Sequence, residues 1–243
     1  MRLLRISFRL LAVLWRLAVG YWTIRVRFSG MDNAQRSDEV QRWSRQMLRA
    51  LGITLHLEGQ APQHGPLMLV ANHLSWLDIL VVHAARHCRF VSKSEVHHWP
   101  LIGPMAAAGG TLFIERASRR DAMRVVHHMA TALESGDMLA IFPEGTTGDG
   151  SVLLPFHANL VQAAISAHAP VMPVGLRYVQ ADGQPSTAVL YIGDDTLVGS
   201  VWRTLGAPAF TARVKFGDTQ MAQGRDRRQW ALDLHAAVND LCR

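Results

Sequence analysis

Beyond residue 52, short apolar runs bounded by turn residues alternate with longer stretches of helical periodicity. The apolar runs predict strands at 53–58, 66–71, 88–92, 110–114, 138–142, 171–178, 187–192 and 209–216. The periodic stretches predict helices at 76–85, 100–107, 119–134, 158–168, 196–205 and 226–241. This alternation is typical of an α/β fold, with a mixed, largely parallel sheet covered by helices.

The first 28 residues follow a different pattern, in which arginines and apolar residues share one helix. Arg2, Arg5, Arg9 and Arg16 recur at intervals of three, four and seven, which places them on one stripe. Leucines and Trp15 cover much of the remaining surface. The pattern predicts an amphipathic helix lying in a membrane interface, with the arginines meeting anionic headgroups.

Two alternatives stay open for this segment, a transmembrane span and a helix packed on a soluble domain. The longest charge-free run, residues 17–24, has eight residues, whereas a span needs about 20 apolar residues. A second helix is expected within residues 31–50, where Trp43 and Met47 follow helical spacing. We therefore expect an N-terminal helical membrane-association segment, residues 1–50, and one further domain, residues 51–243.

Charge and cysteine content narrow the range of partners. Residues 1–28 hold six arginines and no acid, so the other 215 residues balance with 19 basic and 19 acidic side chains. This local charge argues against a nucleic-acid-binding surface and for an anionic partner at the N-terminus. Cys88 and Cys242 show no CxxC or metal-ligand spacing, so we expect reduced thiols and no metal site.

The most informative stretch is Asn72-His73-Leu74-Ser75-Trp76-Leu77-Asp78, which follows a predicted strand. On a regular helix His73 and Asp78 would lie about 140° apart, so only a turn can bring them together. Ser75 suits the N-cap of a helix that starts at Trp76, and this provides the turn. An oriented general base is one interpretation of the pair, and a capping box closed by Asp78 is the other.

Three further motifs follow in order. They are Gly110-Thr111-Leu112-Phe113-Ile114-Glu115-Arg116, Phe142-Pro143-Glu144-Gly145-Thr146-Thr147 and Val171-Met172-Pro173-Val174. With the first motif they resemble the four sequence blocks of the glycerolipid acyltransferase family, of the 1-acylglycerol-3-phosphate acyltransferase type. The family patterns are NHxxxxD, GxxFIxR, FPEGT followed usually by arginine, and VxPV. Three of the four blocks match in full across residues 72–174.

The resemblance implies an acyltransferase of phospholipid biosynthesis that needs no cofactor. It would move a fatty acyl group from acyl-CoA or acyl carrier protein to the free hydroxyl of 1-acylglycerol-3-phosphate, giving phosphatidic acid. The resemblance makes His73 the general base and Asp78 the residue that orients it. It assigns acceptor binding to Arg116, Glu144, Gly145 and Thr146. Attachment to the cytoplasmic face of the inner membrane is also implied, because the lipid substrates reside there.

The departure from the family lies at Thr147, which stands where the arginine is usual. Loss of that cation removes one charge-assisted contact to a phosphate. Another lysolipid, such as lyso-ornithine lipid or a lysophospholipid, is therefore an alternative acceptor. A lipid ester or thioester hydrolase using the same His73 and Asp78 is a competing function, and a non-catalytic lipid-binding module is another.

Overall fold

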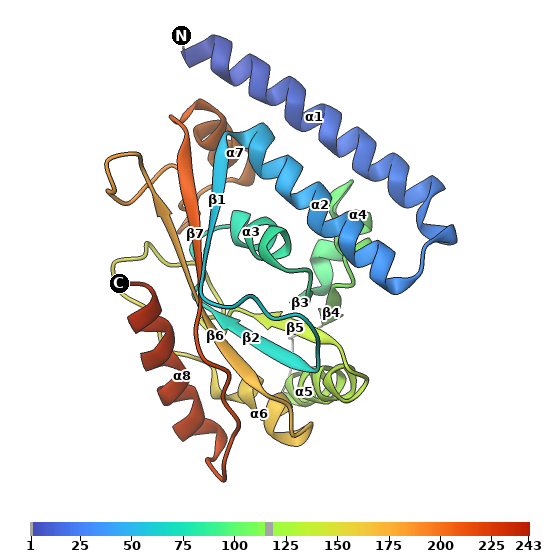
Figure 1. Cartoon of the computed structure of the whole chain (residues 1–243), viewed down its shortest axis with the longest axis vertical. Helices are drawn as coiled ribbons and strands as arrows, with labels where there is room; N and C mark the ends of the chain where they lie inside the picture. Colours follow the sequence, from blue (N-terminus) through green and yellow to red (C-terminus); the bar gives the residue numbers. More distant parts are fainter. Residues whose placement is uncertain (1, 115–118) are drawn as a thin grey trace.

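The computed structural model describes residues 2–114 and 119–243, and its centre is a seven-stranded sheet with helices on both faces (Figure 1). The strands lie in the order β1-β7-β6-β2-β5-β3-β4. Every neighbouring pair is parallel except β6 and β7. The α/β fold with a mixed, largely parallel sheet is thus confirmed. The strands are β1 (Ile53–Glu58), β2 (Leu67–Ala71), β3 (Arg89–Lys93), β4 (Leu112–Ile114), β5 (Met138–Ile141), β6 (Val171–Val179) and β7 (Phe210–Phe216).

The helices agree closely with the periodic stretches of the sequence. Each of the six helices expected beyond residue 52 forms, with ends within two residues of the predicted ones. The helices are α1 (Arg2–Val26), α2 (Asn33–Leu51), α3 (Leu77–Ala85), α4 (Ile102–Ala108), α5 (Arg119–Glu134), α6 (Ala158–Ser166), α7 (Leu197–Gly206) and α8 (Arg227–Leu241). Two 3-10 helices, η1 (Phe28–Gly30) and η2 (Ser94–His98), join them.

The sheet separates two hydrophobic cores. Successive side chains of a strand point to opposite faces, so β2 serves both cores. Leu67 and Leu69 pack with side chains from α2 and α3, whereas Met68 and Val70 pack with side chains from α5, α6 and α8. Because β2, β3, β4 and β5 run in one direction, the loops that follow them gather at one edge of the sheet.

The prediction of a strand at 187–192 is wrong. This segment is buried at Val189 but forms no ladder with a neighbouring strand. Side chains from α7 satisfy its carbonyl groups instead: Arg203 donates to Ala188 and Leu190, and Thr204 donates to Ala188. An apolar run indicates burial, and here it does not indicate which groups accept or donate the backbone hydrogen bonds.

Helices α1 and α2 form an antiparallel pair that covers one side of the domain (Figure 1). Asp32 and Gln35 close a capping box at the start of α2. The indole nitrogen of Trp43 on α2 donates to the carbonyl of Arg16 on α1 at 2.8 Å. Gly20 permits this close approach, because a Cβ there would lie 2.5 Å from that nitrogen.

Three arginines of the α1 stripe bind groups of the protein itself, which corrects the expectation that they meet lipid headgroups. Arg5 donates to the carbonyl of Gly206 at 2.8 Å. Arg9 is buried and donates to the carbonyls of Leu205 at 3.1 Å and Ala207 at 2.7 Å. Arg16 donates to a side chain of α2. The carbonyls at the end of α7 lack helical partners and carry partial negative charge, so they attract the guanidinium groups of Arg5 and Arg9.

With the arginines turned inward, α1 presents an apolar face to solvent. The exposed apolar residues of this helix are Leu3, Leu4, Phe8, Leu11, Leu14, Trp15, Trp22 and Val26. Within the residues that the structure describes, no helix has both the length and the hydropathy needed to cross a membrane. The assignment of residues 1–50 and 51–243 to separate parts stays a prediction.

Candidate active site

His73 and Asp78 meet at the end of β2, as the first motif predicts. Residues 72–76 leave the strand without forming a helix, and α3 begins at Leu77, one residue later than expected. The Nδ1 atom of His73 lies 2.8 Å from Oδ2 of Asp78. With Nδ1–H donating to the carboxylate, Nε2 is the nitrogen left free to accept a proton.

Four donors surround the fully buried carboxylate of Asp78. Oδ2 accepts from His73, from the backbone N–H of Leu74 at 2.6 Å and from that of Ser75 at 2.9 Å. Oδ1 accepts from the Tyr178 hydroxyl at 2.6 Å. Burial, with Asp78 beside it, raises the pKa of Tyr178, so this hydroxyl stays protonated and donates. Asp78 therefore both closes the turn, as in the capping interpretation, and orients His73.

Two neighbours fix the position of His73 itself. Its ring stacks on Phe142, with centroids 4.1 Å apart and planes within 6°. The side chain of Asn72 exchanges two hydrogen bonds with the backbone of Leu176, at 2.7 and 3.0 Å, and so extends the pairing of β2 with β6. Asn72 and Tyr178 were not among the candidate residues. Asn72 carries a sequence signal because it precedes the histidine in the motif.

Glu144 joins the second loop of the site to the first. One carboxylate oxygen accepts from the backbone N–H of His73 at 2.6 Å, and the other accepts from that of Leu154 at 2.9 Å. Burial raises the pKa of the Glu144 carboxyl, and these two hydrogen bonds oppose that shift. Both oxygens thus accept hydrogen bonds from the backbone, so Glu144 positions the loops of His73 and Leu154. Acceptor binding by Glu144 stays a prediction.

Gly145 and Thr146 lie exposed in the turn that follows β5. Gly145 adopts φ +73°, a conformation that favours glycine, and a Cβ there would meet the His157 ring at 2.9 Å. The turn therefore requires glycine for two independent reasons. Thr146 is open to an incoming molecule, and its acceptor role stays a prediction. Arg116, the fourth expected acceptor ligand, lies outside the described residues.

Thr147 is held by the segment 187–192 rather than being free to contact a ligand. Its hydroxyl donates to the carbonyl of Tyr191, and the N–H of Tyr191 donates to the carbonyl of Leu74 at 3.2 Å. Nearby, the N–H of Gly148 donates to the carbonyl of His73 at 2.8 Å. The position at which the family usually has arginine thus links its own loop to the segment 187–192, and neighbouring backbone hydrogen bonds link both to the loop of His73.

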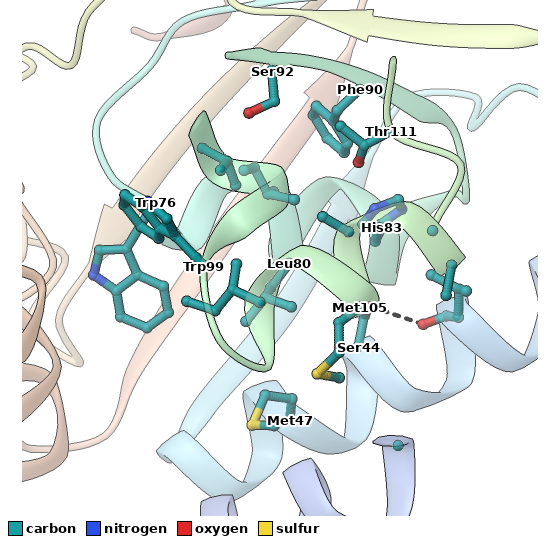
Figure 2. A pocket seen from close by; sticks show the side chains of 18 of the residues that line it. Ser44, Met47, Trp76, Leu80, His83, Phe90, Ser92, Trp99, Met105 and Thr111 are labelled. Atoms are coloured by element: carbon teal, nitrogen blue, oxygen red, sulfur yellow. Dashed lines mark hydrogen bonds between the residues drawn. The ribbon is translucent and has the colours of Figure 1, made fainter. Parts of the chain in front are cut away.

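A cavity of about 640 Å³ opens beside His73 and runs under α1 and α2. Its lining is mostly apolar, and Figure 2 shows several of these side chains, from Met47 and Leu80 to Trp99 and Met105. Val13, Leu17 and Gly20 of α1 belong to the wall, so the N-terminal helices enclose the cavity as well as exposing an outer face.

Lys93, at the end of β3, lines the same cavity and was not singled out from sequence. Its place directly after a predicted strand, at the edge where the other loops gather, is the signal that could have identified it. Over the described part of the chain, no three histidine, cysteine or acidic side chains group in a way that could hold a metal ion. Both cysteines are free thiols.

Comparison with known proteins agrees with this site. A family model described as Acyltransferase matches residues 52–177. The lyso-ornithine lipid O-acyltransferase of Pseudomonas aeruginosa is 36% identical, over 98% of this chain and 92% of that protein. The 1-acyl-sn-glycerol-3-phosphate acyltransferase of Neisseria meningitidis is 37% identical, over 84% of this chain and 81% of that protein.

Solved structures agree on the fold. The crystal structure of the 1-acyl-sn-glycerophosphate acyltransferase from Thermotoga maritima superposes with a TM-score of 0.69 at 18% identity, covering 99% of this chain and 98% of that one. The motif order, the paired His73 and Asp78, the matching family model and the relatives lead to one conclusion. The chain belongs to the glycerolipid acyltransferase family.

Proposed function

We propose that this protein transfers a fatty acyl group from a thioester, acyl-CoA or acyl carrier protein, to the free hydroxyl of a lysolipid. The observation that carries the proposal is an oriented histidine at the mouth of an apolar cavity. Nε2 of His73 is free to accept a proton, and the cavity beside it has a volume typical of ligand sites. An acyl chain is the apolar group that such a cavity suits.

The residues support a direct transfer. His73 takes the proton from the acceptor hydroxyl, whose oxygen attacks the thioester carbonyl carbon. The new C–O bond forms, the C–S bond breaks, and the imidazolium returns its proton to the leaving thiolate. Asp78 stabilises the imidazolium while it exists, as the buried aspartate of a hydrolase triad does. The sequence holds no GxSxG motif, and no cysteine lines the described cavity, so direct transfer is the simpler account.

For the acceptor we propose lyso-ornithine lipid first and 1-acylglycerol-3-phosphate second. A phosphate monoester carries between one and two negative charges, whereas an ornithine headgroup carries a carboxylate and an ammonium. Thr147 brings no cation, and its hydroxyl is occupied by Tyr191. The relative that spans 98% of this chain is a lyso-ornithine lipid O-acyltransferase. Lys93 at the cavity is the observation that keeps the phosphate acceptor as second candidate.

We also propose that the outer face of α1 lies in the cytoplasmic leaflet of the inner membrane. Its apolar residues are exposed in water, where burial in a lipid interface would stabilise them. Arg5, Arg9 and Arg16 are engaged by the protein, so attraction to anionic lipids contributes less than the arginine stripe suggests.

The first prediction tests the reaction with purified protein, labelled acyl thioester and a panel of lysolipids. His73→Ala should lower transfer by about 10³-fold, because a general base contributes about 10²- to 10⁴-fold. Asp78→Asn should lose most of the activity as well. The control is His56→Ala, an exposed histidine on β1, which should transfer normally. Normal turnover by His73→Ala would show that His73 is not the general base. Thioester hydrolysis that needs no acceptor would favour the hydrolase function.

The second prediction concerns the acceptor and compares Thr147→Arg with Thr147→Gln. Arginine should raise kcat/KM for 1-acylglycerol-3-phosphate by about tenfold and lower that for lyso-ornithine lipid, since a charged hydrogen bond contributes about 1.5–3 kcal/mol. Glutamine has similar length without the charge, so it reports only the loss of the contact with Tyr191. A wild-type enzyme that ignores lyso-ornithine lipid but uses 1-acylglycerol-3-phosphate would reverse our order of acceptors.

The third prediction tests Tyr178 as a positioning residue. Tyr178→Phe leaves Oδ1 of the buried Asp78 without its donor, so the carboxylate holds the His73 ring less firmly. We expect kcat to fall up to about tenfold while KM changes little, because Tyr178 is not among the residues that line the cavity. Tyr21→Phe removes an exposed hydroxyl on α1 and serves as the control. An unchanged kcat would limit Tyr178 to a packing role.

The fourth prediction tests membrane docking by vesicle flotation. Replacing Leu11 and Trp15 together by glutamine should lower the vesicle-bound fraction more than tenfold, because each buried large side chain contributes about 1.5–3 kcal/mol. Ala18→Gln adds the same polar group to an exposed position without removing a large apolar side chain, and should change little. High salt should release only part of the protein. Complete release by salt, or a wild type that does not float, would contradict this docking mode.

A further inference from the structure

His83 is a buried polar side chain in the wall of the cavity and has no hydrogen-bond partner. It lies in the last turn of α3, with 6% of its surface exposed. Its ring stacks on His87 and meets Phe90 edge-on, with centroids 5.3 and 4.9 Å away. Within the described part of the chain, the Nδ1 atom is buried without a hydrogen-bond partner, and no hydrogen bond reaches Nε2, the nitrogen on the side of Gly109. Figure 2 shows this ring among the side chains of the pocket.

The chemistry of this imidazole restricts what it can bind. Buried polar groups are nearly always paired, because leaving one unpaired costs free energy. Burial, with a smaller contribution from His87, lowers the pKa of His83 to about 3, so the ring is neutral at physiological pH. A neutral imidazole offers one N–H donor and one lone pair. A hydroxyl group, which both donates and accepts, is its natural partner, whereas an anion would require a cation.

The position of His83 identifies which part of a ligand it would contact. A series of ring contacts leads from the catalytic histidine: His73 to Phe142 at 4.1 Å, Phe142 to Phe90 at 5.6 Å, and Phe90 to His83 at 4.9 Å. His73 and His83 line the same cavity. A chain whose carbonyl group lies at His73 would therefore pass His83 along its hydrocarbon part.

Gly109 keeps the Nε2 atom of His83 open on the cavity side. Both residues line the cavity, and a Cβ on Gly109 would lie 3.5 Å from Nε2. The backbone of Gly109 has φ −73° and ψ 0°, which any residue can adopt. Gly109→Ala would therefore place a methyl group in van der Waals contact with Nε2 and leave the His83 imidazole unchanged.

Building on the proposed function, we propose that His83 binds a hydroxyl group on the hydrocarbon chain of a lipid substrate. The site would make the enzyme selective for hydroxylated chains with the hydroxyl at one position. The same chemistry can come from two sources, the acyl chain of the donor or the chain that the lysolipid acceptor already carries.

Binding is measured first, on the full-length protein, by displacement of a fluorescent fatty acid. The competitors are palmitic acid and its monohydroxy isomers with the hydroxyl at successive positions. We expect one isomer to bind about tenfold more tightly than palmitic acid, as one good hydrogen bond permits. His83→Phe, which keeps an aromatic ring, should remove this gain and leave the affinity for palmitic acid unchanged. Gly109→Ala should also remove the gain while keeping His83.

His56→Phe makes the same substitution at an exposed histidine on β1, outside the cavity lining, and should keep the preference intact. If no isomer gains affinity, or if His83→Phe retains the preference, the proposal is overturned. Equal binding of all the acids to every variant would mean that His83 meets only solvent, which overturns it as well. Gly109→Ala remains informative if His83→Phe does not fold.

Transfer assays then identify the source of the hydroxyl. One arm pairs hydroxylated acyl thioesters with a plain lysolipid, and the other pairs a plain thioester with lysolipids whose chain is hydroxylated. The arm in which His83→Phe lowers kcat/KM about tenfold contains the natural ligand. If plain substrates react but neither hydroxyl confers an advantage, this inference fails alone. If no thioester and lysolipid react at all, the proposed function fails, and the binding measurement still decides the role of His83.

Discussion

A carboxylate with no contact to water needs donors on both oxygens, and Asp78 obtains them from four separate groups. The backbone N–H groups of Leu74 and Ser75 come from the turn after β2, and the hydroxyl of Tyr178 comes from β6. The fourth donor is His73. Because an unpaired buried anion is very unfavourable, this arrangement holds the turn and the strands in one geometry. His73, the proposed general base, is thereby positioned by the same contacts that stabilise the buried charge.

At the same edge of the sheet, Glu144 and Thr147 connect the loop of His73 to neighbouring segments. Glu144 holds the backbone of His73 and Leu154 with one oxygen each, while Thr147 binds the carbonyl of Tyr191. Tyr191 in turn contacts the loop of His73 through the backbone of Leu74. A change at position 147 therefore alters the packing of a neighbouring segment as well as the local charge.

The N-terminal helices serve two surfaces at once. The inner side of α1 supplies Val13 and Leu17 to the cavity, and Arg5 and Arg9 bind the carbonyls at the end of α7. Its outer side is apolar and exposed. An exposed apolar surface and an apolar cavity thus lie on two sides of one helix. With the proposed membrane docking, this arrangement would give a lipid chain a path between a bilayer and His73.

The sequence by itself determined the features that depend on local order along the chain. Periodicity located the six helices beyond residue 52, and apolar runs located the seven strands of the sheet together with one strand, at 187–192, that does not form. The turn between His73 and Asp78 follows from their spacing alone. The tertiary structure decided what depends on partners distant in sequence. In the folded chain Arg9 donates to a carbonyl at the end of α7, and Tyr178 donates to Asp78. The carbonyls of the segment 187–192 accept from side chains of α7 and not from a neighbouring strand. Burial can be read from an apolar run, whereas the identity of the group that satisfies a buried charge or carbonyl depends on how the whole chain packs.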